Sequence, residues 1–182
     1  DQIVLVTGGA RGLGLAISQL LIEEGARIVV NYLSSKTQAE ALQKQYPDQV
    51  FSYQADVTQA DQVKALFTAS KAHFGEGIHS VVNNALVQFE FNGDNRPKVE
   101  DLSWEMMSHQ FSGAVQACLN TTQAALEDMK QAHFGRIVNI GTNLVQNPVV
   151  PYHDYTTAKA ALLAFTRTTA QDLGQYGINV NM

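Results

Sequence analysis

Short apolar runs alternate along the chain with longer segments in which apolar residues recur at helical spacing. The short runs end in glycine, asparagine or other turn-forming residues and predict buried strands, whereas the longer segments predict amphipathic helices. The expected strands cover residues 3–6, 27–31, 50–53, 78–83, 137–140 and 178–180. Parallel neighbours need crossover helices, so this alternation predicts an α/β protein with a doubly wound parallel sheet, a Rossmann fold.

The segments between these strands differ in how clearly the pattern defines them. The two longest helices are expected at residues 101–131 and 153–173, and Thr58 with Asp61 resembles a capping box that opens a shorter one. Residues 86–100 lack periodicity and predict an exposed excursion before the first long helix. Phe89 and Phe91 in that excursion belong either to a substrate rim or to a solvated loop.

Composition and charge fit a single domain over residues 1–182. An apolar share of 45% excludes a disordered chain, and a net charge of −5 argues against binding that depends on neutralising nucleic-acid phosphates. Cys118 is the sole cysteine, which excludes a disulfide framework, and the histidines show no metal-ligand spacing. No apolar run approaches the roughly 20 residues of a membrane span. We expect a cytoplasmic protein with no metal and no membrane partner. Because the chain stops just after a central-looking strand, we also expect its C-terminal part to be missing.

A glycine-rich run, T-G-G-A-R-G-L-G at residues 7–14, joins the first strand to the first helix. In this setting Gly8 permits a tight turn, Gly12 lets the backbone approach a pyrophosphate, and Gly14 lets helix and strand pack closely. The helix start supplies N–H donors and a favourable dipole for the anion, with Arg11 and Leu13 in the same loop. The run predicts dinucleotide binding.

The end of the second strand favours one dinucleotide over the other. A carboxylate there would bond the ribose 2′-hydroxyl of NAD, but this chain has Asn31 at that point. Arg11 lies in the glycine run and Lys36 just past the strand. No carboxylate is present to repel a 2′-phosphate, and these two cations would attract it. We therefore expect NADP as the cofactor, with NAD still possible.

Tyr155 and Lys159 are four residues apart on the last predicted helix, so both side chains lie on one face. A phenol with a pKa of about 10 is a poor acid or base at neutral pH, but a nearby ammonium stabilises the phenolate. Together with the glycine run, this pair resembles the short-chain dehydrogenase/reductase family over essentially the whole chain. Asp56-Val57, Asn83-Asn84-Ala85 and the run at residues 135–140 agree with the resemblance, which is nearest to the 3-oxoacyl-[acyl-carrier-protein] reductases.

The resemblance implies an oxidoreductase that uses NADP(H) to reduce a carbonyl group, such as a 3-oxoacyl thioester or a small ketone. Tyr155 would be the proton donor, and Lys159 would lower its pKa and hold the nicotinamide ribose. Cofactor contacts would come from Asp56 and Val57 at the adenine and from Asn84, Ala85 and Leu86 under the adenosine and ribose. The resemblance also implies fatty acid biosynthesis and a homotetramer, or a dimer, paired through the two long helices. The apolar residues offered for that pairing are Leu119, Ala125, Leu162 and Phe165.

Three positions depart from the family pattern. Thr142 stands at the place of the catalytic serine and keeps a hydroxyl, while Gln110 replaces the asparagine that holds a water in the proton relay. Leu86 replaces the glycine that closes the Asn-Asn-Ala-Gly motif. These departures leave a second function class open, a dinucleotide-binding sensor or structural protein with impaired catalysis. A third reading is an enoyl reductase that uses Tyr152, seven residues before Lys159.

Overall fold

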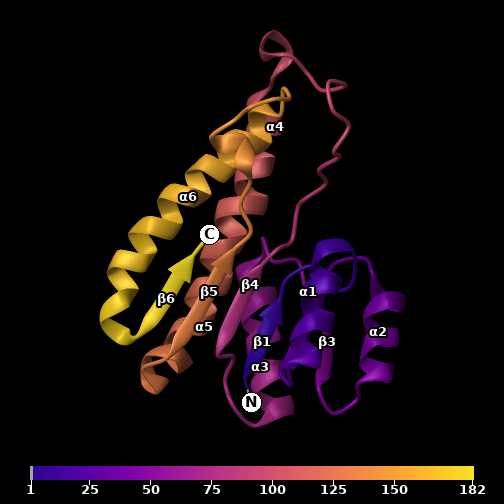
Figure 1. The fold of residues 1–182 in the computed structure, drawn as a ribbon, viewed down its shortest axis with the longest axis vertical. Helices are drawn as coiled ribbons and strands as arrows, with labels where there is room; N and C mark the ends of the chain where they lie inside the picture. The colour runs from indigo at the N-terminus through magenta and orange to yellow at the C-terminus, as the bar shows by residue number, and fades with distance from the viewer. Residues whose placement is uncertain (1) are drawn as a thin grey trace.

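Six parallel strands form one sheet in the order β3-β2-β1-β4-β5-β6 in the computed structural model, which describes residues 2–182. The strands are β1 Ile3–Val6, β2 Arg27–Tyr32, β3 Val50–Gln54, β4 Ser80–Asn83, β5 Gly135–Asn139 and β6 Ile178–Asn181. This order is that of the doubly wound dinucleotide-binding fold, so the predicted fold class is confirmed. Figure 1 shows the strands running in one direction, with their carboxyl ends facing the upper part of the molecule.

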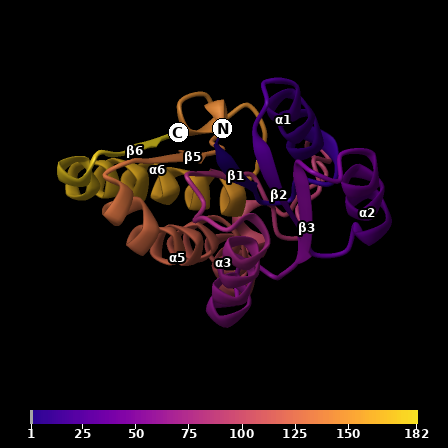
Figure 2. The same cartoon turned by 90° about the horizontal axis from the view of Figure 1, so that it is seen from below.

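Helices cover both faces of the sheet, as Figure 2 shows. One face packs against α1 (Gly12–Glu23) and α2 (Lys36–Gln45). The other face packs against α3 (Ala60–Phe74), α5 (Ala117–Ala132) and α6 (His153–Leu173). Side chains alternate along a strand, so successive residues of an apolar run are buried on opposite faces of the sheet. The runs therefore contribute to a hydrophobic core on each face. Every helix among residues 2–182 is too short or too polar to cross a membrane.

The first long predicted helix is continuous but not uniform. It comprises α4 (Trp104–Phe111), a π-helical segment at Ser112–Gln116 and α5, and it begins at residue 104 rather than 101. A β-carbon at Gly113 would lie 2.6 Å from Cγ2 of Val87, so glycine lets the helix approach the segment that follows β4. π-segments occur often at functional sites, and this one lies against Val87 in the segment that follows β4.

The predicted capping box at Thr58 is wrong. Helix α3 begins at Ala60, and no side chain within the described residues 2–182 caps it. The Thr58 hydroxyl instead donates to the Asp56 carboxylate at 2.7 Å, and the Thr58 backbone N–H donates to the same oxygen at 2.9 Å. The Asp56 carboxylate, two residues earlier, binds the Thr58 side chain and forms the turn that follows β3, so the Thr58 hydroxyl does not cap the helix.

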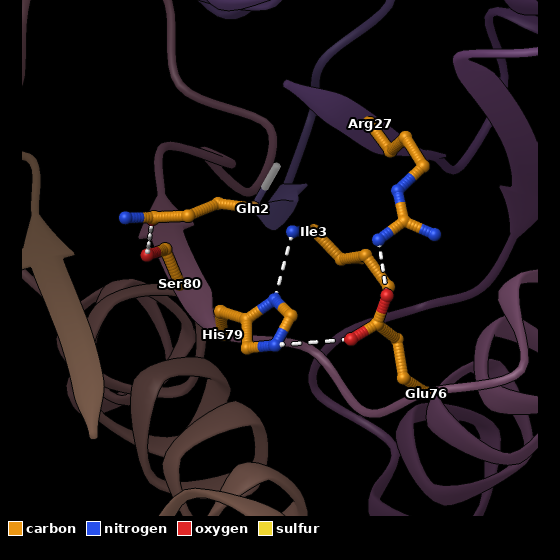
Figure 3. Close-up of polar contacts among 6 residues, drawn as sticks. All are labelled: Gln2, Ile3, Arg27, Glu76, His79 and Ser80. Atoms are coloured by element: carbon orange, nitrogen blue, oxygen red, sulfur yellow. Dashed lines mark hydrogen bonds and ion pairs between the residues drawn. The ribbon is translucent and has the colours of Figure 1, made fainter. Parts of the chain in front are cut away.

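A polar cluster ties the amino ends of the central strands together, as Figure 3 shows. Nδ1 of His79 accepts the Ile3 backbone N–H at 2.9 Å, and Nε2 of His79 lies 3.5 Å from the Glu76 carboxylate. Glu76 also pairs with Arg27 at the start of β2. These contacts connect β1, β2 and the entry to β4 at the edge of the sheet opposite the glycine run.

Candidate active site

The glycine run and the end of β4 meet at the carboxyl edge of the sheet. Strands β1 and β4 are neighbours here although the chain leaves them in opposite directions, and ligands bind at such switch points. Oγ1 of Thr7 accepts the backbone N–H groups of Asn84 at 2.9 Å and Ala85 at 3.0 Å. The Asn84 amide donates back to the Thr7 carbonyl at 3.0 Å. The predicted cofactor residues after β1 and β4 are therefore joined directly.

The glycine run has the shape that a pyrophosphate needs. Gly8 and Gly12 have φ values of +63° and +53°, the left-handed region that favours glycine. A β-carbon at Gly14 would overlap the Gly8 carbonyl oxygen and lie 2.6 Å from the Asn84 amide nitrogen. No side chain among residues 2–182 caps the start of α1, so its first-turn N–H groups are free to bind an anion. The loop fits a dinucleotide on these grounds.

Asn31 supports this loop from beneath. Its side chain is buried, accepts the Gly8 backbone N–H at 3.4 Å and donates to the Ala55 carbonyl at 2.9 Å. The amide thus holds β2, the glycine run and the residue after β3 together, and it lies away from solvent. Arg11 is exposed in the loop, whereas exposed Lys36 lies 3.6 Å from Glu40 in an ion pair.

The predicted adenine residues follow β3 at the same edge of the sheet. Asp56 is half-buried and holds Thr58, while Val57 is buried and its carbonyl accepts the Asn120 amide of α5 at 3.0 Å. This bond anchors the turn after β3 to a helix on the opposite side of the switch point. The turn is thereby fixed beside the glycine run.

Thr142, Tyr155 and Lys159 come together where β5 ends and α6 begins. Tyr155 and Lys159 are 5% and 3% exposed, and Nζ of Lys159 lies 5.8 Å from the centre of the Tyr155 ring. Nζ also donates to the Ile140 carbonyl at 2.6 Å, which fixes the ammonium at the end of β5. Burial lowers the pKa of Lys159. Burial also raises the pKa of Tyr155, and a hydrogen bond with the Thr142 side chain opposes that rise.

The other two departures from the family pattern lie beside the segment that follows β4. The buried Gln110 side chain donates to the Val87 carbonyl at 3.2 Å, so its amide fastens this segment to α4. Leu86 is 38% exposed, and its bulk is accommodated at the surface. Cys118 is buried close to Lys159; burial raises the pKa of its thiol to about 12, which keeps it neutral.

Arg96 and Asp154 also lie at the site, although the sequence did not indicate them. The Arg96 guanidinium binds both Asp154 carboxylate oxygens at 2.7 Å, directly beside Tyr155 in the chain. No local pattern signals this pair, because its members are 58 residues apart and Arg96 lies in the aperiodic excursion. The described residues contain no cluster of His, Cys, Asp and Glu side chains that could hold a metal ion.

The sequence profile of the family described as "short chain dehydrogenase" matches residues 2–182. The chain belongs to this family. The resemblance inferred from the glycine run and the Tyr155–Lys159 pair is therefore confirmed, and the protein is an oxidoreductase of the short chain dehydrogenase type.

Three relatives illustrate the range of the match. The chain is 31% identical to an NADPH-dependent aldehyde reductase 2 of Arabidopsis thaliana, over 99% of this chain and 70% of that protein. It is 32% identical to the 3-oxoacyl-[acyl-carrier-protein] reductase FabG of Staphylococcus aureus, over 97% of this chain and 70% of that protein. A solved structure assigned as a 3-oxoacyl-reductase from Bacillus thuringiensis superposes with a TM-score of 0.88 at 27% identity, covering 100% of this chain and 75% of that one.

A buried polar network connects the strands beneath the site of this short chain dehydrogenase to its helices. The Asn83 side-chain amide donates to the side-chain oxygen Oδ1 of Asn139 at 2.8 Å, and the Asn139 side-chain amide donates to the Thr166 hydroxyl at 2.9 Å. The Thr121 hydroxyl donates to Asn83 at 2.8 Å. The network thus ties α5 and α6 to β4 and β5, which fixes the helix that carries Tyr155.

Replacing Asn139 with leucine is expected to lower the free energy of unfolding by about 1–3 kcal/mol, because the buried Asn83 amide loses its acceptor. Urea denaturation measures the difference. Asn179→Leu is the matched control, since Asn179 is exposed on β6, and its effect should stay within about 0.5 kcal/mol. Equal losses in the two variants would contradict the role of the network.

Proposed function

We propose that this short chain dehydrogenase is an NADPH-dependent carbonyl reductase with Tyr155 as its proton donor. The observation that carries the proposal is the convergence of Thr142, Tyr155 and Lys159 beside a glycine run shaped for a pyrophosphate. Hydroxyl, phenol and ammonium groups at one edge of the sheet are what proton transfer to a carbonyl oxygen requires.

Each of the three side chains has one task in the proposed reaction. The nicotinamide cofactor, when bound, supplies the hydride that reaches the carbonyl carbon. Tyr155 gives its phenolic proton to the carbonyl oxygen, and the Thr142 hydroxyl hydrogen-bonds that oxygen as negative charge develops on it. Lys159 keeps two N–H donors beyond the one bound to Ile140, enough to bind a ribose hydroxyl and to stabilise the phenolate.

The substrate is proposed from the relatives, because the chain itself names none. An aldehyde reductase and a 3-oxoacyl-[acyl-carrier-protein] reductase match the chain almost equally well. We therefore expect reduction of an aldehyde or a 3-oxoacyl thioester, the second of which belongs to fatty acid biosynthesis. NADPH oxidation with a panel of both classes tests the proposal. Tight NADPH binding without turnover of any member would favour the sensor or structural protein instead.

An enoyl reductase that uses Tyr152 is a weaker candidate. The Tyr152 hydroxyl accepts the Gly93 backbone N–H at 2.7 Å and its side chain is 6% exposed. The hydroxyl therefore serves the excursion that follows β4. Tyr155, in contrast, lies beside both Thr142 and Lys159.

NADPH is expected to bind more tightly than NADH, because Arg11 is the exposed cation of the glycine run and no carboxylate lies at the end of β2 or in the seven residues after it. Arg11→Ala should raise the dissociation constant of NADPH about tenfold and leave that of NADH nearly unchanged, as a charge-assisted hydrogen bond to the 2′-phosphate is lost. Isothermal titration calorimetry measures both constants. Arg167→Ala, exposed on α6, is the control. Equal wild-type affinities for the two nucleotides would contradict the preference.

A homotetramer, or a dimer, is proposed from the family resemblance, but the residues offered for the interface need correction. Ala125 and Leu162 are each 1% exposed and belong to the core of the chain itself. Leu119 on α5 is 37% exposed and Phe165 on α6 is half-buried. We expect light scattering to give a multiple of the chain mass and Leu119→Lys to reduce it. A monomeric mass for the wild type would contradict this expectation.

A further inference from the structure

The excursion that follows β4 folds back over the start of the catalytic helix. Residues 87–98 form no helix or strand, yet they rise past the carboxyl ends of the strands to the level of α4 and the first turn of α6 (Figure 1). Three contacts fasten this excursion to the start of α6. Arg96 pairs with Asp154, Phe89 packs on Tyr155, and the Gly93 N–H donates to the hydroxyl of Tyr152, the residue directly before the helix. A loop that was merely solvated would not converge on one helical turn.

The first contact is an ion pair shielded from water. Both Asp154 oxygens lie 2.7 Å from the Arg96 guanidinium, and the two side chains are only 5% and 13% exposed. The guanidinium also lies 4.6 Å from the ring centre of Phe89 and 5.7 Å from that of Tyr152. Both carboxylate oxygens accept from the single nitrogen Nη2 of Arg96, and arginine suits this place because its planar group stacks on rings while it holds the carboxylate.

In the second contact the Phe89 ring forms a wall against the ring of Tyr155. The Phe89 ring stacks on the Tyr155 ring with centres 4.5 Å apart and an interplanar angle of 28°. Phe91 and Tyr152 approach the same ring edge-on, at 5.9 Å and 6.4 Å. A substrate whose carbonyl oxygen reaches the Tyr155 hydroxyl must therefore lie next to this aromatic group.

Arg96 contacts both the aromatic ring of Phe89 and the carboxylate of Asp154. The pair holds the backbone of the excursion to α6, and the guanidinium packs on Phe89, the ring that covers Tyr155. Losing either charge leaves the other enclosed without a partner, which is strongly unfavourable, so the excursion would detach to let water in. The position of Phe89 consequently depends on the ion pair.

We propose that Arg96 and Asp154 form a latch that positions Phe89 as a wall of the substrate site, and that this wall selects carbonyl compounds with a flat, unsaturated ring next to the carbonyl group. The substrate preference rests on the carbonyl reductase function proposed above, whereas the latch does not. Aromatic rings attract flat π-systems through offset or edge-to-face contacts, which saturated rings cannot make. Arg96 and Asp154 are positioning residues and Phe89 sets specificity.

Hydrogen exchange tests the latch without using catalysis. In Arg96→Lys the charge remains but the planar group that stacks on Phe89 is lost, so the Gly93 amide, which donates to the Tyr152 hydroxyl at 2.7 Å, should exchange at least about tenfold faster than in the wild type. Asp154→Asn should give the same pattern. Lys98→Ala, an exposed change in the same segment, is the control and should leave exchange unaltered. Unchanged exchange in both Arg96→Lys and Asp154→Asn would overturn the latch.

A pair of matched aldehydes tests the wall. Benzaldehyde and cyclohexanecarbaldehyde differ in whether the ring is flat, so the ratio of their kcat/KM values reports the aromatic contact. In Phe89→Leu the ratio should fall about three- to tenfold, with the NADPH dissociation constant unchanged. Arg96→Lys should lower the same ratio, whereas a purely structural residue would slow both aldehydes equally. An unaltered ratio in Phe89→Leu, or a wild type that reduces 3-oxoacyl thioesters but neither aldehyde, would overturn the wall. A wild type that reduces no aldehyde and no 3-oxoacyl thioester would contradict the carbonyl reductase function, while the exchange result still decides the latch.

Discussion

Tyr155→Phe is expected to lower turnover about 10²–10⁴-fold, the usual cost of removing a general acid. The change deletes only the phenolic hydroxyl, and the ring keeps its packing against Phe89 and Lys159. Because the glycine run is untouched, the NADPH dissociation constant should stay nearly the same. Steady-state kinetics with the most active aldehyde or thioester, together with NADPH titration, gives both quantities.

Two further tyrosine variants make that result specific. Tyr53→Phe, on β3 and away from the site, controls for the loss of any phenol and should keep full turnover. Tyr152→Phe removes the acceptor of the Gly93 N–H and should have a much smaller effect than Tyr155→Phe. Full activity in Tyr155→Phe with inactivity in Tyr152→Phe would instead support enoyl reduction.

Thr142→Val is expected to lower turnover about 10²–10³-fold, as found when one hydrogen-bond donor to a developing oxyanion is removed. The Thr142 hydroxyl oxygen accepts the Leu144 backbone N–H at 3.3 Å, and the hydroxyl that hydrogen-bonds the Tyr155 side chain can donate instead to a carbonyl oxygen bound beside it. Valine keeps the shape of threonine without that donor. Single-turnover reduction at saturating NADPH isolates the chemical step from cofactor binding.

Thr142→Ser is the matched variant, because serine keeps the hydroxyl and removes only the methyl group. It should retain or raise turnover if Thr142 does the work of the serine that the family usually carries. Thermal denaturation of both variants separates catalysis from stability, since valine also loses the acceptor of the Leu144 N–H. Equal activity of the valine and serine variants would show that the hydroxyl takes no part.

The sheet and the glycine run were predictable because each depends on local pattern. The apolar runs specify strands, and the glycines at positions 8, 12 and 14 occupy places where backbone angle or close approach excludes a larger residue. The start of α3 was mispredicted because the Asp56 carboxylate, only two residues before Thr58, binds the Thr58 hydroxyl and backbone N–H in a turn. That contact is local, and the Asp-x-Thr pattern is the signal that could have shown it.

The segment over the active site could not be predicted, because its contacts join residues far apart in the sequence. Arg96 and Phe89 reach Asp154 and Tyr155 only after the chain has closed around β5, and nothing in residues 86–100 encodes that partner. The structural role of Asn31 could not be predicted from the sequence either. The sequence placed it near the cofactor, and the structure uses its buried amide to support the glycine run.

The central claim is that this chain moves a hydride from NADPH to a carbonyl carbon while Tyr155 protonates the oxygen. NADPH that carries deuterium in the transferred C4 position tests it directly, with mass spectrometry of the alcohol formed from the aldehyde and 3-oxoacyl thioester panel. We expect the wild type to give an alcohol with one deuterium on the carbinol carbon, and Tyr155→Phe to give almost none in the same time. Tight binding of NADPH with no labelled alcohol from any substrate, or equal labelling by the two proteins, would contradict the account.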